Sequence, residues 1–136
     1  MTKVMCFGTF DLLHVGHLDY FRQAKQHGDY LIVVIARDST KETQGKEVTF
    51  TEDERLELIK SLRIVDEAVL GNKEDHFKVI RDVGPDVIFL GYDHPAVELE
   101  GFKILRGKPY NVDVHKSSEL RRKILGATGH TNFKAK

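Results

Sequence analysis

The chain has 136 residues, of which 40% are hydrophobic, and its 21 basic and 21 acidic side chains give a formal net charge of zero. This size and composition predict one soluble globular domain, and the charge balance argues against a nucleic-acid or membrane-surface partner. A single cysteine, Cys6, excludes a disulfide framework and a cysteine metal site, which favours a cytoplasmic location. No apolar run approaches the ~20 residues that cross a bilayer, and no signal peptide is predicted.

The first predicted elements form a strand–helix–strand unit. Residues 4–7 are a short apolar run in which we expect Cys6 to be buried. Residues 15–26 have the apolar spacing of a helix, and residues 30–36, YLIVVIA, are typical of a strand covered on both faces of a parallel sheet. This order of elements is that of a βαβ unit.

A polar segment, residues 37–50, comes next and is predicted to be a loop. The following helix begins at Thr51, which forms a capping box with Glu54 three residues further on. The remaining elements are predicted in the order strand 65–70, a helix around residues 77–83, strand 87–90, strand 112–114 and helix 118–125.

The alternation of strands and helices predicts an α/β fold, a doubly wound, Rossmann-like parallel sheet of about five strands with helices on both faces. We expect a single domain over residues 1–125 and a flexible tail over residues 126–136. Ligands bind such sheets beyond the carboxyl ends of the strands, where the strand order reverses. Polar segments with candidate site residues follow three predicted strands, at residues 8–17, 37–47 and 91–94.

The segment 8–17 reads GTFDLLHVGH and begins with the residue types of a phosphate-binding loop. Gly8 lets the backbone turn tightly and approach a ligand, and the amides of Thr9 and Phe10 can then face an anion. The N-terminus of the following helix adds N–H groups and a partial positive charge.

The same segment ends in two histidines, His14 and His17, which lie about one helical turn apart. Imidazoles donate hydrogen bonds to phosphate oxygens, and Gly16 between the two rings leaves room for a ligand. Zinc binding is the weaker alternative, because the chain offers no third ligand at short spacing.

This motif resembles the signature of the cytidylyltransferase-like nucleotidyltransferases, and the resemblance extends over residues 4 to about 125. These enzymes transfer a nucleoside monophosphate from a nucleoside triphosphate to a phosphate-bearing acceptor and release pyrophosphate. The resemblance implies that His14 and His17 bind the phosphates and stabilise the transition state. It also implies that the rest of the motif contacts the nucleotide, namely Gly8, Thr9, Phe10, Val15 and Gly16.

The resemblance also assigns residues outside the motif. A basic residue after the second strand reaches the triphosphate, and Lys46 is the candidate, with Lys41 as its competitor. Asp93, in LGYDH, is expected against the ribose or base of the nucleotide. Ser117 and Ser118, in KSSELRRKI, match a pair of hydroxyl residues that holds the phosphates, the alternative being an ordinary helix cap. Further candidate contacts to the substrates are Asp11, Asp38 and Arg55.

Two kinds of small enzyme share these motifs. The stretches VIARD and LGYDH are more similar to the archaeal-type FAD synthetases, which adenylylate FMN, than to the glycerol-3-phosphate cytidylyltransferases. The latter carry an Arg-Thr-x-Gly-Ile-Ser run where this chain reads NVDVHKSSEL, whereas FAD synthetases commonly carry C-terminal cysteines that this chain lacks. We therefore expect ATP and FMN as substrates, with CTP and glycerol 3-phosphate, or another sugar phosphate, as the alternative.

The resemblance implies Mg²⁺ carried by the triphosphate, since that ion prefers phosphate oxygens and waters to a protein cage. It also implies a homodimer, because small members of the family tend to dimerise. A module that binds a nucleotide without turning it over is a further alternative, which the presence of both His14 and His17 disfavours.

Overall fold

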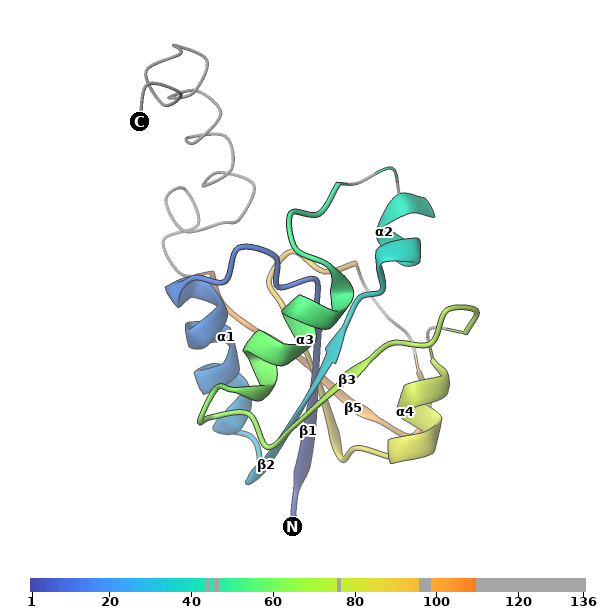
Figure 1. The fold of residues 1–136 in the computed structure, drawn as a ribbon. Coiled ribbons are helices and arrows are strands. Elements are labelled where there is room, and N and C mark those ends of the chain that lie inside the picture. The colour runs from blue at the N-terminus through green and yellow to red at the C-terminus, as the bar shows by residue number, and fades with distance from the viewer. Residues whose placement is uncertain (44, 46, 76, 96–98, 110–136) are drawn as a thin grey trace, which may run out of the picture.

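The computed structural model describes residues 1–43, 45, 47–75, 77–95 and 99–109, in which helices connect most of the successive strands (Figure 1). The predictions for Lys46, Ser117, Ser118, strand 112–114, helix 118–125 and the tail lie outside these residues. The elements are β1 (Lys3–Gly8), α1 (Val15–Lys25), β2 (Tyr30–Ile35), α2 (Asp38–Thr43), α3 (Glu52–Lys60), β3 (Glu67–Leu70), α4 (Lys78–Val83), β4 (Val87–Leu90) and β5 (Lys103–Arg106).

The described strands form one parallel sheet in the order β3-β2-β1-β4-β5, which confirms the predicted doubly wound fold. The chain moves outward from β1 to β2 and β3, and then returns to place β4 on the other side of β1. The strand order therefore reverses between β1 and β4. Pairing of β1 with β2 continues to Gly8, whereas its pairing with β4 ends at Cys6 and Phe89, so the strands separate at the carboxyl edge.

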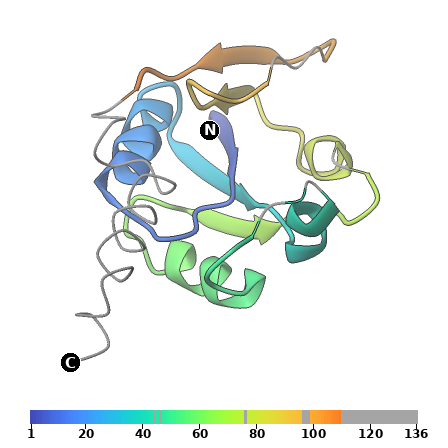
Figure 2. The ribbon, with the colours of Figure 1, turned by 90° about the horizontal axis from the view of Figure 1, so that it is seen from above.

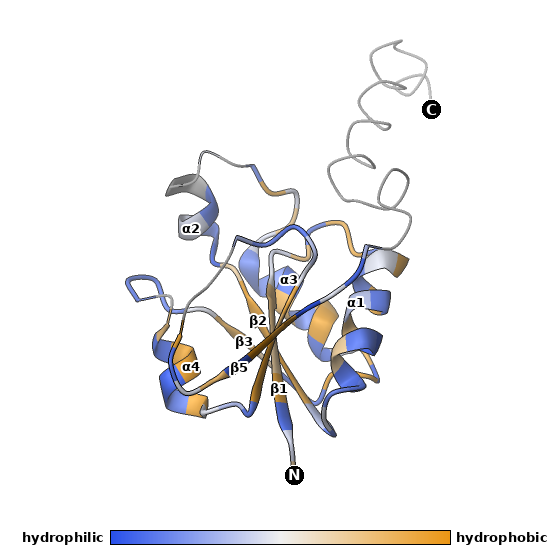
Figure 3. Ribbon diagram, turned by 180° about the vertical axis from the view of Figure 1, so that it is seen from behind, coloured by the Kyte–Doolittle hydropathy of each residue, from blue (hydrophilic) through white to orange (hydrophobic). Residues whose placement is uncertain are grey.

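The sheet is covered on both faces. Alternating residues of β1 point to opposite sides: Val4 and Cys6 pack with α1 and α3, and Met5 packs with α4. Seen from above, α1 and α4 lie on opposite sides of the sheet (Figure 2). The strands are mostly hydrophobic and the outer helix surfaces mostly hydrophilic (Figure 3), as expected for strands buried on both faces.

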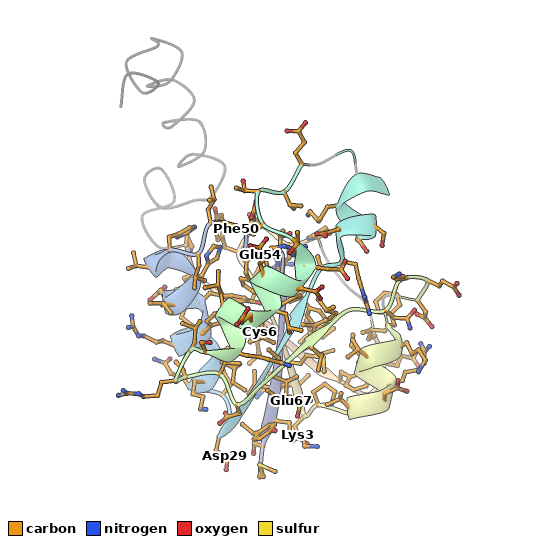
Figure 4. All side chains as sticks on the ribbon, in the orientation of Figure 1. Lys3, Cys6, Asp29, Phe50, Glu54 and Glu67 are labelled. Atoms are coloured by element: carbon orange, nitrogen blue, oxygen red, sulfur yellow. The ribbon has the colours of Figure 1, made fainter. Side chains whose placement is uncertain are left out.

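The strongest sequence signals are confirmed. Helix α1 begins at Val15, and Thr51 caps α3 through the predicted reciprocal hydrogen bonds with Glu54. Cys6 lies fully buried at the centre of the sheet (Figure 4), where burial raises the pKa of its thiol. In the same view Phe50 and Glu54 lie toward the carboxyl edge, and Lys3 and Asp29 lie at the opposite end.

Two elements differ from the sequence prediction. The polar segment after β2, predicted to be a loop, contains the short helix α2. Strand β5 forms over residues 103–106, which the sequence analysis left unassigned, and it pairs with β4. Its only apolar residues are Ile104 and Leu105, between two exposed cations, so it lacks the continuous apolar run of the inner strands. Within the described ranges, no helix has the length and apolar character needed to cross a membrane.

Candidate active site

The two histidines of the motif cap helix α1. The Gly16 backbone N–H donates to His14 Nδ1 at 3.1 Å, and the His14 backbone N–H donates to His17 Nδ1 at 3.1 Å. This is a capping box in which both positions are filled by imidazoles. The two ring centroids lie 3.9 Å apart. The pair that the sequence placed at the helix entry is thus held there by the helix backbone itself.

The capping hydrogen bonds also fix which ring nitrogen carries the proton. Because Nδ1 of His14 and of His17 accepts a backbone N–H, the neutral form of each ring carries its proton on Nε2. Burial, together with the neighbouring His14, lowers the pKa of His17 to about 3, and the charge of Asp11 opposes this shift. His17 is therefore neutral at physiological pH, and each ring presents an Nε2–H donor of fixed tautomer.

The loop before the histidines has an unusual backbone. Phe10 and Leu12 adopt φ values of 54° and 51°, in the left-handed region that side chains rarely occupy. The Phe10 ring is buried directly over Gly8, where a Cβ would lie 2.6 Å from the ring, and it meets His17 edge-on at 5.4 Å. The missing side chain of Gly8 thus makes room for Phe10, and not, as the sequence analysis expected, for the ligand directly.

Asp11 anchors the segment that precedes α3. Its buried carboxylate accepts the backbone N–H groups of Thr49 at 2.6 Å and Phe50 at 2.9 Å, one on each oxygen. The loop of the histidine motif and the segment before α3, 38 residues apart in sequence, are joined by this carboxylate. In this structure Asp11 serves as a structural tie, while a contact with substrate stays a prediction.

Arg55, a candidate contact to the substrates, is fully buried. Its Nε donates to the carbonyl of Phe50 at 3.1 Å, and its Nη1 donates to those of Thr9 at 2.9 Å and Ala36 at 2.8 Å. Its Nη2 forms an ion pair with Asp38 at 2.6 Å. A guanidinium with these four bonds and no exposed surface positions loops, and this corrects the expectation of a direct phosphate contact.

Asp38 belongs to the same network. One of its oxygens pairs with Arg55, and the other accepts the backbone N–H of Glu52 at 3.1 Å. The Glu52 carboxylate in turn accepts the Asp38 backbone N–H and pairs with Arg37 at 2.9 Å. Asp38 therefore joins the start of α2 to the start of α3, and its direct contact with a substrate, like that of Asp11, stays a prediction.

The turn after β4 carries Asp93 and is built by two residues that sequence analysis missed. The Gly91 backbone N–H donates to His94 Nδ1 at 3.0 Å. Arg106 of β5 donates from Nη1 to the carbonyls of Gly91 at 2.8 Å and His94 at 2.7 Å. The only available signal was the stretch LGYDH, because nothing in the sequence linked it to Arg106.

Tyr20 of α1 lies at the point where β1 and β4 separate. Its hydroxyl donates to the Phe89 carbonyl at 2.6 Å and receives the Phe7 backbone N–H at 3.4 Å. Its ring lies 6.4 Å from Phe10 and 6.2 Å, edge-on, from His94. A row of neighbouring rings thus connects the start of α1 with the turn after β4, and its members are His14, His17, Phe10, Tyr20 and His94.

This edge of the sheet offers imidazole N–H donors in fixed positions, and the nearby carboxylates of Asp11 and Asp38 are engaged in structural bonds. Such a site can bind anionic groups and stabilise charge that develops on them, which is what phosphoryl-type transfer requires. Across the described part of the chain, no group of three or more His, Cys, Asp or Glu side chains is arranged to hold a metal ion.

The fold and the donor site are those of a nucleotidyltransferase, and the model of the cytidylyltransferase-like family matches residues 5–122, so the chain belongs to this family. Among curated proteins it is 42% identical to an FAD synthase of Thermoplasma volcanium over 95% of this chain and 98% of the relative. It is 43% identical to an FAD synthase of Methanohalophilus mahii, over 92% and 95%. An FAD synthase of Picrophilus torridus is 39% identical, over 90% and 96%.

A solved structure has the same fold. It is described as the lipopolysaccharide core biosynthesis protein of Thermoplasma volcanium, with a TM-score of 0.78 and 43% sequence identity. The match covers 82% of this chain and 99% of that one. Its description names a different process from that of the curated relatives.

Proposed function

We propose that this chain is an FMN adenylyltransferase, which transfers AMP from ATP to FMN and forms FAD and pyrophosphate. The observation that carries the proposal is the pair of histidines, His14 and His17, whose rings are fixed in orientation by hydrogen bonds from the α1 backbone. The FAD synthase names of relatives about 40% identical over most of the chain support ATP and FMN as the substrates.

In the proposed reaction an oxygen of the FMN phosphate attacks the α-phosphorus of ATP. A new P–O bond forms, the bond between the α-phosphorus and the bridging oxygen breaks, and pyrophosphate leaves with that oxygen. The Nε2–H groups of His14 and His17 donate to phosphate oxygens and stabilise the charge that grows on the leaving group. No general base is required, because the attacking phosphate is already anionic.

ATP enters this reaction as its magnesium complex, since Mg²⁺ takes its ligands from phosphate oxygens and waters. The ion supplies charge neutralisation on the phosphates, and chelation by EDTA should abolish pyrophosphate release. The assignments of Asp93 to the nucleotide and of Lys46 or Lys41, Ser117 and Ser118 to the phosphates remain part of the proposal. So do a homodimer and a cytoplasmic location.

The experiment offers the purified protein ATP or CTP with FMN or glycerol 3-phosphate, and follows pyrophosphate release and FAD. We expect FAD and pyrophosphate with ATP and FMN only. Turnover with CTP and glycerol 3-phosphate alone would replace FMN adenylylation by the alternative reaction. Tight nucleotide binding by calorimetry, with no pyrophosphate released from any pair of substrates, would show a binding module instead.

A conservative variant tests the role of His17 in the reaction. In His17→Asn, the side-chain oxygen can still accept the His14 backbone N–H, whereas the Nε2–H donor is lost. We expect a rate loss of about 10²-fold, the scale for removal of one donor to a developing oxyanion. His27→Asn, at an exposed ring after α1, is the control and should turn over like the parent protein. A normal rate for His17→Asn would remove this residue from the mechanism.

A further inference from the structure

The ring of His94 is held by the same kind of hydrogen bond as the rings of His14 and His17. In all three residues a backbone N–H donates to Nδ1: from Gly91 for His94, from Gly16 for His14 and from His14 for His17. The neutral His94 ring therefore also carries its proton on Nε2. A sequence motif marks the first two histidines, but only the structure shows that a third ring shares their hydrogen-bonding arrangement.

His94 stands where ligands of this fold class bind, beside the separation of β1 and β4. Its ring packs edge-on against Tyr20, whose hydroxyl lies between the two strands on the Phe89 carbonyl. Tyr20 in turn packs against Phe10, and Phe10 packs against His17. His94 thus approaches the carboxyl edge from the β4 side, and the motif histidines approach it from the α1 side.

Burial, more than the charges around it, keeps the ring of His94 neutral. Burial lowers its pKa most, Asp93 opposes that shift, and the positive charges of Arg106 and Lys41 lower the pKa further. Arg106 is held by the carbonyls of the turn, whereas Lys41 belongs to α2, across β1 from β4. Lys41 therefore contributes positive charge from the β2 side of the sheet.

We infer that the Nε2–H of His94 binds the phosphate of the acceptor, as the counterpart of the donors that hold the nucleotide. The inference rests on the proposed function, in which an oxygen of the FMN phosphate must come within about 3–3.5 Å of the α-phosphorus of ATP, so two anionic groups must be held side by side. Donors on one side alone leave the second phosphate without a partner to fix its position. His94 supplies a donor on the opposite side.

Two variants separate this role from a structural one. In His94→Asn, the side-chain oxygen takes the position of Nδ1 and can accept the Gly91 N–H, but no donor remains at the position of Nε2. In His94→Gln, the amide can place a donor near the position of Nε2, but the bond to Gly91 is lost. His27→Asn is the control, because this exposed histidine lies at the far end of α1.

Steady-state kinetics with FMN and ATP varied in turn provide the readout, together with FMN binding followed by fluorescence without ATP. For His94→Asn we expect a KM and a dissociation constant for FMN raised about tenfold or more, the scale of one hydrogen bond to a charged group. Its KM for ATP should stay within about twofold of the parent value, and His94→Gln should recover most of the FMN affinity.

Other results overturn the inference. If His94 only shapes the turn, His94→Asn behaves like the parent protein and His94→Gln is the impaired variant. If the KM for ATP rises instead, His94 belongs to the nucleotide. If the parent protein makes FAD and the variants show either of these patterns, only the role of His94 is refuted. If the parent protein neither binds FMN nor makes FAD, the proposed function is refuted and the inference with it.

Discussion

The buried guanidinium of Arg55 donates a 2.9 Å hydrogen bond to the backbone carbonyl of Thr9, 46 residues earlier in the chain. Thr9 lies between Gly8 and Phe10, in the loop that leads to the histidine motif. The same Nη1 atom also binds the carbonyl of Ala36, just beyond β2. One side chain of α3 therefore sets the relative position of the two loops that follow β1 and β2, and the shape of the site depends on it.

Replacing Arg55 by Met should destabilise the protein by about 1–3 kcal/mol, the scale for leaving buried hydrogen-bonding groups without their partner. The variant leaves the Asp38 carboxylate and three carbonyls without their donor. Urea denaturation measures the loss. Arg22→Met, on the exposed side of α1, should stay within about 0.5 kcal/mol of the parent protein. A loss below about 1 kcal/mol for the Arg55 variant would contradict the positioning role.

Asp11→Asn should release the segment before α3. The amide can offer one acceptor oxygen, but its NH₂ group faces a backbone N–H that needs an acceptor, so about 1–3 kcal/mol of stability should be lost. Hydrogen exchange at the backbone amides of Thr49 and Phe50 should accelerate more than exchange in α1. Asp82→Asn, at an exposed ion pair with Lys78, is the matched control. Unchanged protection at both amides would be inconsistent with the tie.

Gly8→Ala should displace the Phe10 ring, because the new methyl group would lie 2.6 Å from it. We expect a cost of about 1–3 kcal/mol from overpacking and a lower rate of FAD formation, since Phe10 packs against His17. Gly71→Ala is the comparison, because the atoms nearest to its new Cβ lie at 3.7 Å, an ordinary contact. Equal stability of the two variants would refute this packing explanation.

The titration of His17 should make the free energy of unfolding depend on pH. The pKa of its ring is about 3 in the folded protein against an ordinary 6.5, so between these values the unfolded chain binds more protons. This contribution is fully present above pH 6.5 and is lost as the pH falls toward 3, with a slope of at most about 1.4 kcal/mol per pH unit.

Urea denaturation between about pH 4 and pH 7 measures this slope. His17→Asn removes the titrating ring and should flatten the curve, whereas His27→Asn, at an exposed ring, should leave it unchanged. The same slope in His17→Asn and in the parent protein would show that the ring is not held neutral by its surroundings.

The fold could be predicted where a single segment carries its own signal. The apolar run of β2 and the capping box of Thr51 and Glu54 are local patterns, and both appear in the structure as expected. Strand β5 has only Ile104 and Leu105 as apolar residues and depends on pairing with β4. Helix α2 is short and polar throughout. Neither has a periodicity that sequence alone can detect.

The histidine motif of the site could be predicted from the sequence, but the residues that hold the surrounding loops in position could not. Spacing alone placed His14 and His17 at the entry of α1, but their tautomers depend on the capping geometry. Arg55 reads as a surface residue on a charged helix, because its partners are carbonyls and a carboxylate from three other segments. Interactions of that kind leave no pattern in the sequence, since any residue can supply a carbonyl.

The hydroxyl of Tyr20, which joins β1 to the carbonyl of Phe89, limits how the protein can move during turnover. Burial raises the pKa of this phenol well above its ordinary value, so the tie persists at any pH at which the protein works. The two halves of the sheet therefore cannot spread to admit a substrate without breaking a 2.6 Å hydrogen bond. A conformational change that admits a substrate would therefore leave the junction of β1 and β4 in place.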